Sequence, residues 1–315
     1  MFGPEDMERK NMREAMRNGA PAGWGGALAL LCATVLLGAL DPAMAQTPGL
    51  GQPEPGGINF QVAASPIMEF MHWFHNAFLL PIIVVISVFV AVLLLWCMFR
   101  FSEKRNPVAS KVTHHVGLEV AWTVIPVFIL IIIAVPSFRL LYQQLTIPRA
   151  DVTIKAIAST WKWSYEYPDN GNFSFVSTMQ TEQEIAERVA RGTPRSEVPR
   201  LLAVDNEVVV PVNKIVRVQV TSSDVIHAFA LPSFGVKVDA VPGRLNETWF
   251  QATREGIFYG QCSELCGKDH AFMPIAIRVV SEQAYAAWLE EAKKKFASAE
   301  QPATTVAAAD LPAAR

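Results

Sequence analysis

The sequence predicts a transmembrane hairpin of two helices followed by an all-β domain outside the membrane. Residues 77–99 and 120–138 are apolar and carry no charged side chain, and each segment is long enough to cross a bilayer as a helix. From residue 151 onward the chain consists of short segments rich in β-branched and aromatic residues, separated by turn residues. That pattern is typical of a β-sandwich or barrel. The formal net charge of −2 indicates no nucleic-acid role.

The start of the chain has the features of a secretory signal peptide. A basic head is followed by apolar residues 27–40 and by an Ala-Met-Ala cleavage pattern that ends at Ala45. The alternative is a third membrane span, but the apolar stretch is too short for one. We therefore expect residues 1–45 to be removed and the mature chain to begin at Gln46.

The charges that flank the two apolar segments predict their orientation. The connecting loop carries Lys104, Arg105 and Lys111, whereas residues 46–76 contain no lysine or arginine. By the positive-inside rule the loop is cytoplasmic and both termini lie outside, which places the chain in a bacterial inner membrane with a periplasmic domain. The predicted parts after the signal peptide are a periplasmic N-terminal segment (46–76), a first span (77–100), a cytoplasmic loop (101–117), a second span (118–141), the β domain (142–296) and a disordered Ala/Pro-rich tail (297–315).

Potential metal ligands are concentrated in the stretch QCSELCGKDHAFMP, which contains Cys262, Cys266, His270 and Met273. The stretch alone is compatible with a disulfide, which an oxidising compartment permits, with a tetrahedral zinc site, or with a copper site. The thioether of Met273 favours copper, and His227 in SSDVIHAFALP supplies a second imidazole. Two thiolates can also bridge two copper ions that are each bound by one histidine. One electron shared between two ions changes bond lengths little.

Five stretches of the chain resemble the subunit II family of haem–copper cytochrome c oxidases. They are LEVAWTVIPV, WKWSYEYPD, LLAVDN, TSSDVIHAFALPSFGVKVDAVPGR and GIFYGQCSELCGKDHAFMP. The resemblance extends over residues 65–285. It implies that the β domain is a cupredoxin-like Greek-key sandwich that carries a dinuclear copper centre, CuA.

The resemblance also implies a role for each potential ligand. Cys262 and Cys266 would bridge the two copper ions, and His227 and His270 would be the terminal ligands. Met273 would bind one copper ion, and a backbone carbonyl in the same loop would bind the other.

Further roles are implied for Glu264, Trp161 and Glu119. Glu264 would supply the backbone carbonyl and help to bind a magnesium ion shared with subunit I, although its position alone suggests a solvated loop carboxylate. Trp161 matches the tryptophan through which electrons enter from cytochrome c, although alternating aromatic residues in a strand are usually core residues. Glu119 matches the entrance of a proton-uptake route into subunit I. Its position alone suggests an acid at a helix start.

Three acidic residues match positions that dock cytochrome c in the family: Glu166, Asp205 and Asp224. Taken alone, any one of them is better explained as an ordinary solvated surface charge. Attraction by such charges raises the association rate and weakens with salt.

The resemblance implies a respiratory cytochrome c oxidase subunit. It would accept electrons from cytochrome c and pass them to the haem of subunit I, where oxygen reduction is coupled to proton translocation. Subunits I and III would be partners, and the chain would catalyse nothing alone. The alternatives are a CuA-bearing subunit of a nitric oxide reductase and a copper-binding CxxxC redox chaperone; the intact ligand set argues against a quinol oxidase subunit.

Overall fold

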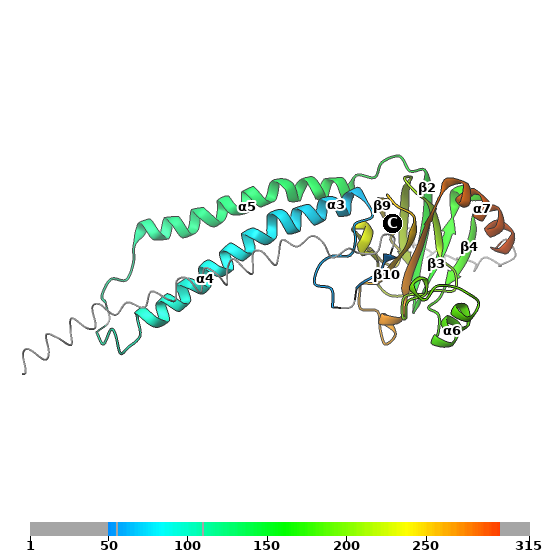
Figure 1. The fold of residues 1–315 in the computed structure, drawn as a ribbon. Helices are drawn as coiled ribbons and strands as arrows, with labels where there is room; N and C mark the ends of the chain where they lie inside the picture. The colour runs from blue at the N-terminus through cyan, green and yellow to red at the C-terminus, as the bar shows by residue number, and fades with distance from the viewer. Residues whose placement is uncertain (1–49, 55, 109, 297–315) are drawn as a thin grey trace, which may run out of the picture. The chain divides into compact units, whose positions relative to one another are not determined.

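The computed structural model describes residues 50–54, 56–108 and 110–296 (Figure 1). The predicted signal peptide and the predicted disordered tail lie outside the described residues. In the described part, two long helices precede a two-sheet β domain, in agreement with the fold class that the sequence predicts.

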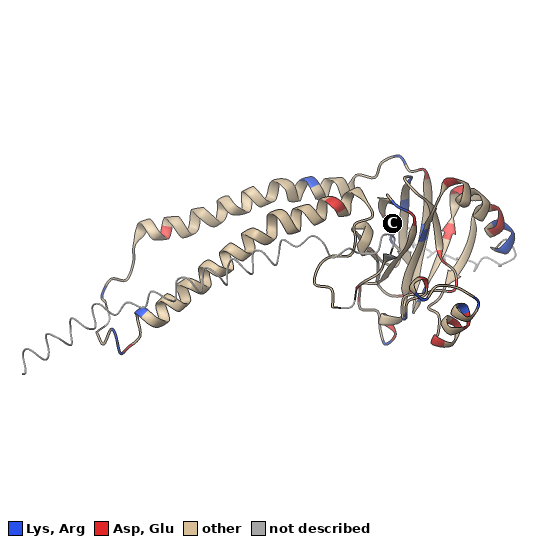
Figure 2. Cartoon of the chain, viewed as in Figure 1, with Lys and Arg blue, Asp and Glu red and all other residues tan. Residues whose placement is uncertain are grey.

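The first long helix is continuous over Pro66–Arg100. It consists of α3 (Pro66–His72), the π-helical segment η1 (Trp73–Leu79) and α4 (Leu80–Arg100). The second long helix is α5 (Val116–Leu145). Both are long and apolar enough to cross a membrane, and charged side chains are confined to the parts near their ends (Figure 2).

The local sequence explains where the two helices begin. The Ser65 hydroxyl accepts a hydrogen bond from the backbone N–H of Met68 at 3.0 Å, and a proline occupies the first helical position. The His115 ring accepts a hydrogen bond from the N–H of Leu118 at 3.2 Å, so an imidazole caps α5. Each cap supplies an acceptor to a backbone donor in the first turn, and the Leu118 N–H is shared with the His115 carbonyl oxygen at 3.0 Å.

The β domain contains two sheets. The strands of the first sheet are β2 (Val152–Ser159), β3 (Lys162–Tyr167), β4 (Phe173–Ser177), β6 (Ile215–Ser222) and β9 (Asn246–Gln251). The strands of the second sheet are β1 (Leu50–Gly51), β5 (Val208–Pro211), β7 (His227–Leu231), β8 (Val236–Ala240), β10 (Gly256–Cys262) and β11 (Pro274–Val280). The first sheet has the order β4-β3-β2-β6-β9. The second has the order β5-β11-β10-β7-β8, with β1 beside β10. The β2/β6, β5/β11 and β1/β10 pairs are parallel and the other pairs are antiparallel.

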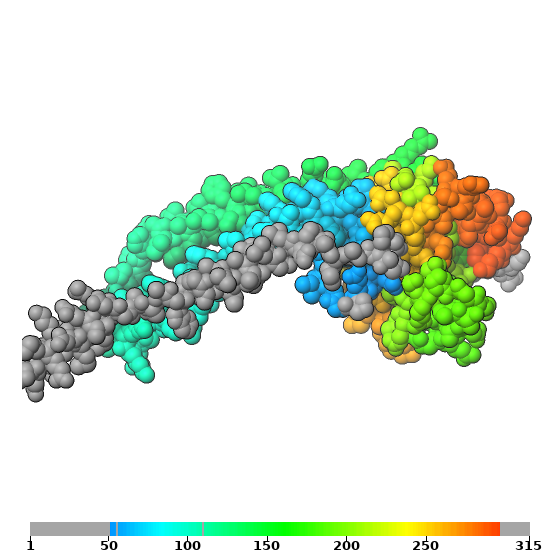
Figure 3. Space-filling view, viewed as in Figure 1, coloured from blue at the N-terminus to red at the C-terminus, as the bar shows by residue number. Residues whose placement is uncertain are grey.

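The hydrophobic core lies on the inner faces of the sheets. Residues along β2 and β6 alternate between buried and half-buried, as expected for strands with one face in a core. Trp163, Tyr165 and Tyr167 of β3 are fully buried. The C-terminal helix α7 (Glu282–Phe296) packs on the end of this row, with the Trp288 ring centroid 5.3 Å from that of Tyr167, and forms part of the domain surface (Figure 3). The buried side chains along β3 therefore anchor the strand in the core, and α7 covers its end at Tyr167.

Candidate metal centre

The end of β10 and the start of β7 bring the potential ligands together. His227 is the first residue of β7 and Cys262 the last residue of β10, and the two strands pair antiparallel at this end. Gly260 allows the close approach, because a Cβ atom at that position would lie 1.9 Å from the Ala230 carbonyl oxygen. Residues 263–273, including the short 3-10 turn η5 (His270–Phe272), then connect β10 to β11.

The side chains that the sequence predicts as ligands form one cluster. The Sγ atoms of Cys262 and Cys266 lie 3.8 Å apart. His227 Nδ1 is 3.8 Å from Cys262 Sγ, and His270 Nδ1 is 3.5 Å from Cys266 Sγ. Met273 Sδ is 3.7 Å from Cys266 Sγ. Each cysteine thus has one imidazole beside it, and the thioether lies on the Cys266 side.

The backbone carbonyl of Glu264 belongs to the same cluster, because its oxygen is 3.3 Å from Cys262 Sγ. The Glu264 side chain itself is exposed. His227, Cys262 and Cys266 are buried, and their ligand atoms lie within 4.8 Å of one another. Among the described residues, this is the only group of three His, Cys, Asp or Glu side chains close enough to hold one metal ion.

The two cysteines are free thiols in this structure. Their separation of 3.8 Å is far longer than a disulfide bond of about 2.05 Å. Burial and the neighbouring Cys262 raise the pKa of the Cys266 thiol to about 12. A buried thiol pair beside two imidazoles and a thioether is a soft donor set, and a bound cation would offset the cost of ionising the thiols. The donor chemistry fits copper.

Asp224 fixes the orientation of the His227 ring. Its Oδ1 lies 3.0 Å from His227 Nε2, so the other ring nitrogen faces Cys262. Its Oδ2 accepts hydrogen bonds from the Thr160 backbone N–H at 2.7 Å and from the Thr160 hydroxyl at 2.8 Å. Partial burial raises the pKa of Asp224, but the hydrogen bonds from His227, Thr160 and Val225 outweigh it and hold the pKa well below its usual value. One carboxylate therefore connects a candidate ligand to the β2–β3 turn.

The loop that bears the potential ligands is hydrogen-bonded to two indoles, one in the β2–β3 turn and one in β3. Trp161 Nε1 donates to the Cys266 carbonyl at 3.3 Å, and Trp163 Nε1 donates to the Met273 carbonyl at 3.3 Å. Gly267 packs against the Trp161 ring with φ +122°, and an added Cβ would lie 3.0 Å from the ring atom Cζ2. Trp163 is fully buried, whereas Trp161 is half-buried.

Comparison with known proteins agrees with this geometry. The family model "Cytochrome C oxidase subunit II, periplasmic domain" matches residues 152–280, and "Cytochrome C oxidase subunit II, transmembrane domain" matches residues 53–140. The chain is 49% identical over 285 residues to cytochrome c oxidase subunit 2 of Cereibacter sphaeroides, covering 85% of this chain and 89% of that protein.

The chain belongs to the cytochrome c oxidase subunit II family.

Two further relatives illustrate the extent of the similarity. A probable cytochrome c oxidase subunit 2 of Rickettsia felis is 48% identical, covering 80% of this chain and 76% of that protein. The crystal structure of the periplasmic domain of subunit II of cytochrome oxidase from Bradyrhizobium japonicum is 64% identical. The superposition covers 48% of this chain and 99% of the Bradyrhizobium japonicum chain, with a TM-score of 0.42. The predicted family and fold class are confirmed: the chain is a subunit of an oxidoreductase complex, with two apolar helices and a cupredoxin-like periplasmic domain. The His/Cys/Cys group is consistent with the CuA site of the subunit II family.

The three predicted docking acids are all engaged in local contacts. Glu166 forms an ion pair with Lys155 at 3.0 Å. Asp205 accepts hydrogen bonds from the backbone N–H and the hydroxyl of Thr178 at 2.7 and 2.9 Å. Asp224 makes the contacts described above. The docking role of these residues remains a prediction, and the structure adds positioning roles that sequence reasoning missed.

Glu119 lies apart from the metal cluster, in the first turn of α5. Its carboxylate accepts a hydrogen bond from the His115 backbone N–H at 3.3 Å. Together with the imidazole cap, this contact gives the helix start two side-chain partners. This local contact is distinct from the proton-uptake role that the resemblance implies for Glu119, which stays a prediction.

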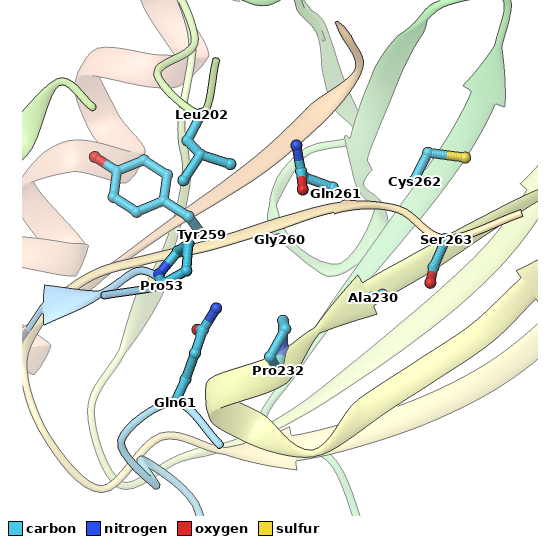
Figure 4. A pocket seen from close by; sticks show the side chains of 10 residues that line it. All are labelled: Pro53, Gln61, Leu202, Ala230, Pro232, Tyr259, Gly260, Gln261, Cys262 and Ser263. Carbon is cyan, nitrogen blue, oxygen red and sulfur yellow. The ribbon is translucent and has the colours of Figure 1, made fainter. Parts of the chain in front are cut away.

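A pocket on β10 adjoins the metal cluster, and Cys262 is one of the residues that line it. The Cys262 sulfur points away from Tyr259 and Gln61, which line the pocket (Figure 4). The other lining residues are Pro53, Leu202, Ala230, Pro232, Gly260, Gln261 and Ser263. We assign the pocket no part in metal binding.

Proposed function

We propose that this chain is the subunit of a respiratory oxidase that accepts electrons from cytochrome c and delivers them to the haem-bearing subunit I. The observation that carries the proposal is the cluster of two buried thiols, two imidazoles and one thioether in a member of the subunit II family. Oxygen reduction and proton translocation would take place in subunit I, with subunit III as a further partner.

The residues that would hold the two copper ions are those of the cluster. Cys262 and Cys266 would bridge them, with His227 and His270 as terminal ligands. Met273 and the Glu264 carbonyl would complete the site. When bound, a copper pair supplies one-electron storage with little change in bond length.

The Trp161 indole is the proposed point at which electrons enter. It is half-buried rather than enclosed, and its N–H donates to the carbonyl of Cys266, one of the two bridging residues. This hydrogen bond is a short through-bond connection from the surface to the ligand set. Gly267 and Asp224 hold the indole and the preceding turn in position.

Other family roles apply to parts of the chain away from the cluster. The exposed carboxylate of Glu264 would help to bind magnesium at the boundary with subunit I, and Glu119 would lie at the entrance of a proton-uptake route into that subunit. The chain would lie in a bacterial inner membrane, with residues 101–117 cytoplasmic and residues 142–296 periplasmic after removal of the signal peptide.

Copper loading of residues 142–296 tests the metal site. We expect two copper ions per chain and a seven-line mixed-valence EPR signal. Cys266→Ser should abolish that signal, whereas Ser263→Ala, which changes an exposed side chain in the same loop, should leave it intact. A four-line signal in the unaltered protein, or binding of zinc only, would reject the dicopper proposal.

Substitution of Trp161 in the intact oxidase tests the point at which electrons enter. Trp161→Phe should slow reduction by cytochrome c and leave the copper spectrum unchanged. Trp249→Phe is the matched control, because Trp249 Nε1 also donates to a backbone carbonyl, that of Gln143, away from the cluster. Equal rates in the Trp161 variant and the unaltered oxidase would remove Trp161 from the path.

A further inference from the structure

The backbone of Met273 is held by two hydrogen bonds to one carbonyl oxygen. The Trp163 indole donates to this oxygen from Nε1 at 3.3 Å, and the Cys262 backbone N–H donates to it at 3.2 Å. Met273 is 1% exposed, and its Sδ lies 3.7 Å from Cys266 Sγ. The residue that bears the thioether is therefore tied at its backbone both to a candidate bridging cysteine and to an indole of the first sheet.

Trp163 is itself fixed in the core by packing and by strand pairing. It is fully buried, and its ring lies edge-on to Phe229 of β7 with the centroids 5.5 Å apart. The His227 ring centroid is 6.4 Å away. The backbone of β3 pairs with β2 on one side and with β4 on the other. Because the indole is enclosed on a paired strand, its hydrogen bond holds the Met273 carbonyl at a set place relative to the sheet.

The thioether is the donor whose position matters most for the properties of a copper site. A methionine sulfur is a weak ligand at long distance, and such a ligand tunes the reduction potential of copper. The methionine side chain has three rotatable bonds, so its own stiffness does not set where Sδ lies. The backbone contacts of Met273 and the packing around it must set that place.

We infer that Trp163 is a positioning residue for Met273, whose indole hydrogen bond holds the thioether close to the copper pair and lowers the reduction potential of that pair. The inference rests on the proposed function, because it takes two copper ions bound by the cluster. A neutral sulfur donor stabilises the oxidised pair, which carries more positive charge, more than the reduced pair. Withdrawal of the thioether should therefore raise the potential.

The sign of the change separates this role from a purely electrostatic one. An indole N–H presents the positive end of its dipole, which by itself destabilises the oxidised pair. If Trp163 acted only as such a dipole, removing the N–H would lower the potential. If it positions Met273, removing the N–H should raise the potential.

Redox titration of the intact detergent-purified oxidase, followed by the EPR signal of the copper pair, tests the inference. Trp163→Phe removes the N–H and part of the ring. A second form carries 3-(3-benzothienyl)alanine at position 163, in which sulfur replaces the ring nitrogen, so that the ring volume is kept if Trp163→Phe fails to assemble. Tyr167→Phe is the matched control, because Tyr167 is also fully buried in β3 and hydrogen-bonded to a backbone, but that of Val209 rather than the ligand loop.

Both altered forms of Trp163 should keep two copper ions and the seven-line signal. At a fixed ambient potential, their ratio of reduced to oxidised pair should rise about tenfold, which corresponds to about 59 mV for a one-electron couple. Tyr167→Phe should leave the ratio unchanged. An unchanged or lowered potential in the form that carries the sulfur analogue would overturn the inference.

A double-variant cycle with Met273→Leu shows whether the effect passes through the thioether. Leucine keeps the backbone carbonyl that accepts from Trp163 but supplies no sulfur donor. Met273→Leu should raise the potential by itself, and adding the sulfur analogue at position 163 should then change the ratio less than about twofold, because the two changes act through one group. A further tenfold change in the combined form would refute action through Met273.

Failure of the proposed function gives a different result. A cluster that holds one copper ion, or zinc only, gives no seven-line signal in the unaltered oxidase, before any variant is compared. A seven-line signal with equal potentials in the unaltered and Trp163 forms leaves the metal assignment standing and rejects the positioning role.

Discussion

Replacing Asp224 should weaken copper binding and destabilise the β domain at the same time. Its carboxylate accepts hydrogen bonds from both the N–H and the hydroxyl of Thr160 and orients His227 at 3.0 Å. In Asp224→Asn an NH2 group replaces one carboxylate oxygen and cannot accept a hydrogen bond. The hydrogen bonds that this oxygen accepts are therefore lost. Two hydrogen bonds to a partly exposed charged group correspond to about 2–3 kcal/mol.

The assay is urea unfolding and copper titration of residues 142–296. A loss of about 2–3 kcal/mol lowers the urea midpoint by about 0.7–3 M, given an m-value of about 1–3 kcal/mol/M. Loss of the partner that orients a ligand histidine should also weaken metal binding about 10–100-fold.

Asp205→Asn is the matched control for this prediction. Asp205 binds the N–H and the hydroxyl of Thr178 just as Asp224 binds those of Thr160, but it does not contact a candidate ligand. It should lose stability and keep its copper affinity. Equal copper affinities in the two variants would refute the idea that Asp224 acts through His227.

Two further predictions concern buried tyrosines and the glycine beside the indole. Tyr167→Phe should lower the free energy of unfolding by about 1–3 kcal/mol, because the hydroxyl bonds to both the carbonyl and the N–H of Val209. Tyr165→Phe should be neutral or stabilising by up to about 1 kcal/mol, because its buried hydroxyl has no hydrogen-bond partner among the described residues; equal losses in the two variants, measured by urea unfolding, would contradict this reasoning. Gly267→Ala should displace the Trp161 ring and cost about 1–3 kcal/mol in backbone strain. Stopped-flow reduction by cytochrome c should then be slower at unchanged copper content, and an unchanged rate would show that the ring position does not matter.

The sequence predicts the fold class and the cluster for identifiable physical reasons. Uncharged segments long enough to span a bilayer have few alternatives to a membrane helix. Cys262, Cys266, His270 and Met273 lie so close in sequence that one loop brings them together, and the choice of metal follows from the softness of their donor atoms.

The contacts that hold the cluster in place could not be predicted in the same way. From the sequence alone Asp224 would be assigned as a surface acid. Its hydrogen bond with Thr160 joins residues 64 positions apart and depends on how the chain folds. The contact of Trp161 with Cys266 spans 105 positions. Alternating aromatic residues also do not reveal that β3 begins only at Lys162, which leaves Trp161 in the turn and half-buried while Trp163 is fully buried.

The two indole hydrogen bonds have a consequence for protein engineering. Trp161 and Trp163 donate hydrogen bonds to the carbonyls of Cys266 and Met273, so the length of chain between those carbonyls is matched to the spacing of one ring in the β2–β3 turn and one in β3. Transplanting residues 261–274 alone onto the β-sandwich of another protein would carry over the donor atoms without the two indole hydrogen bonds that set their spacing. A graft that also copies the β2–β3 turn should give a loop that is already shaped for metal when it is empty.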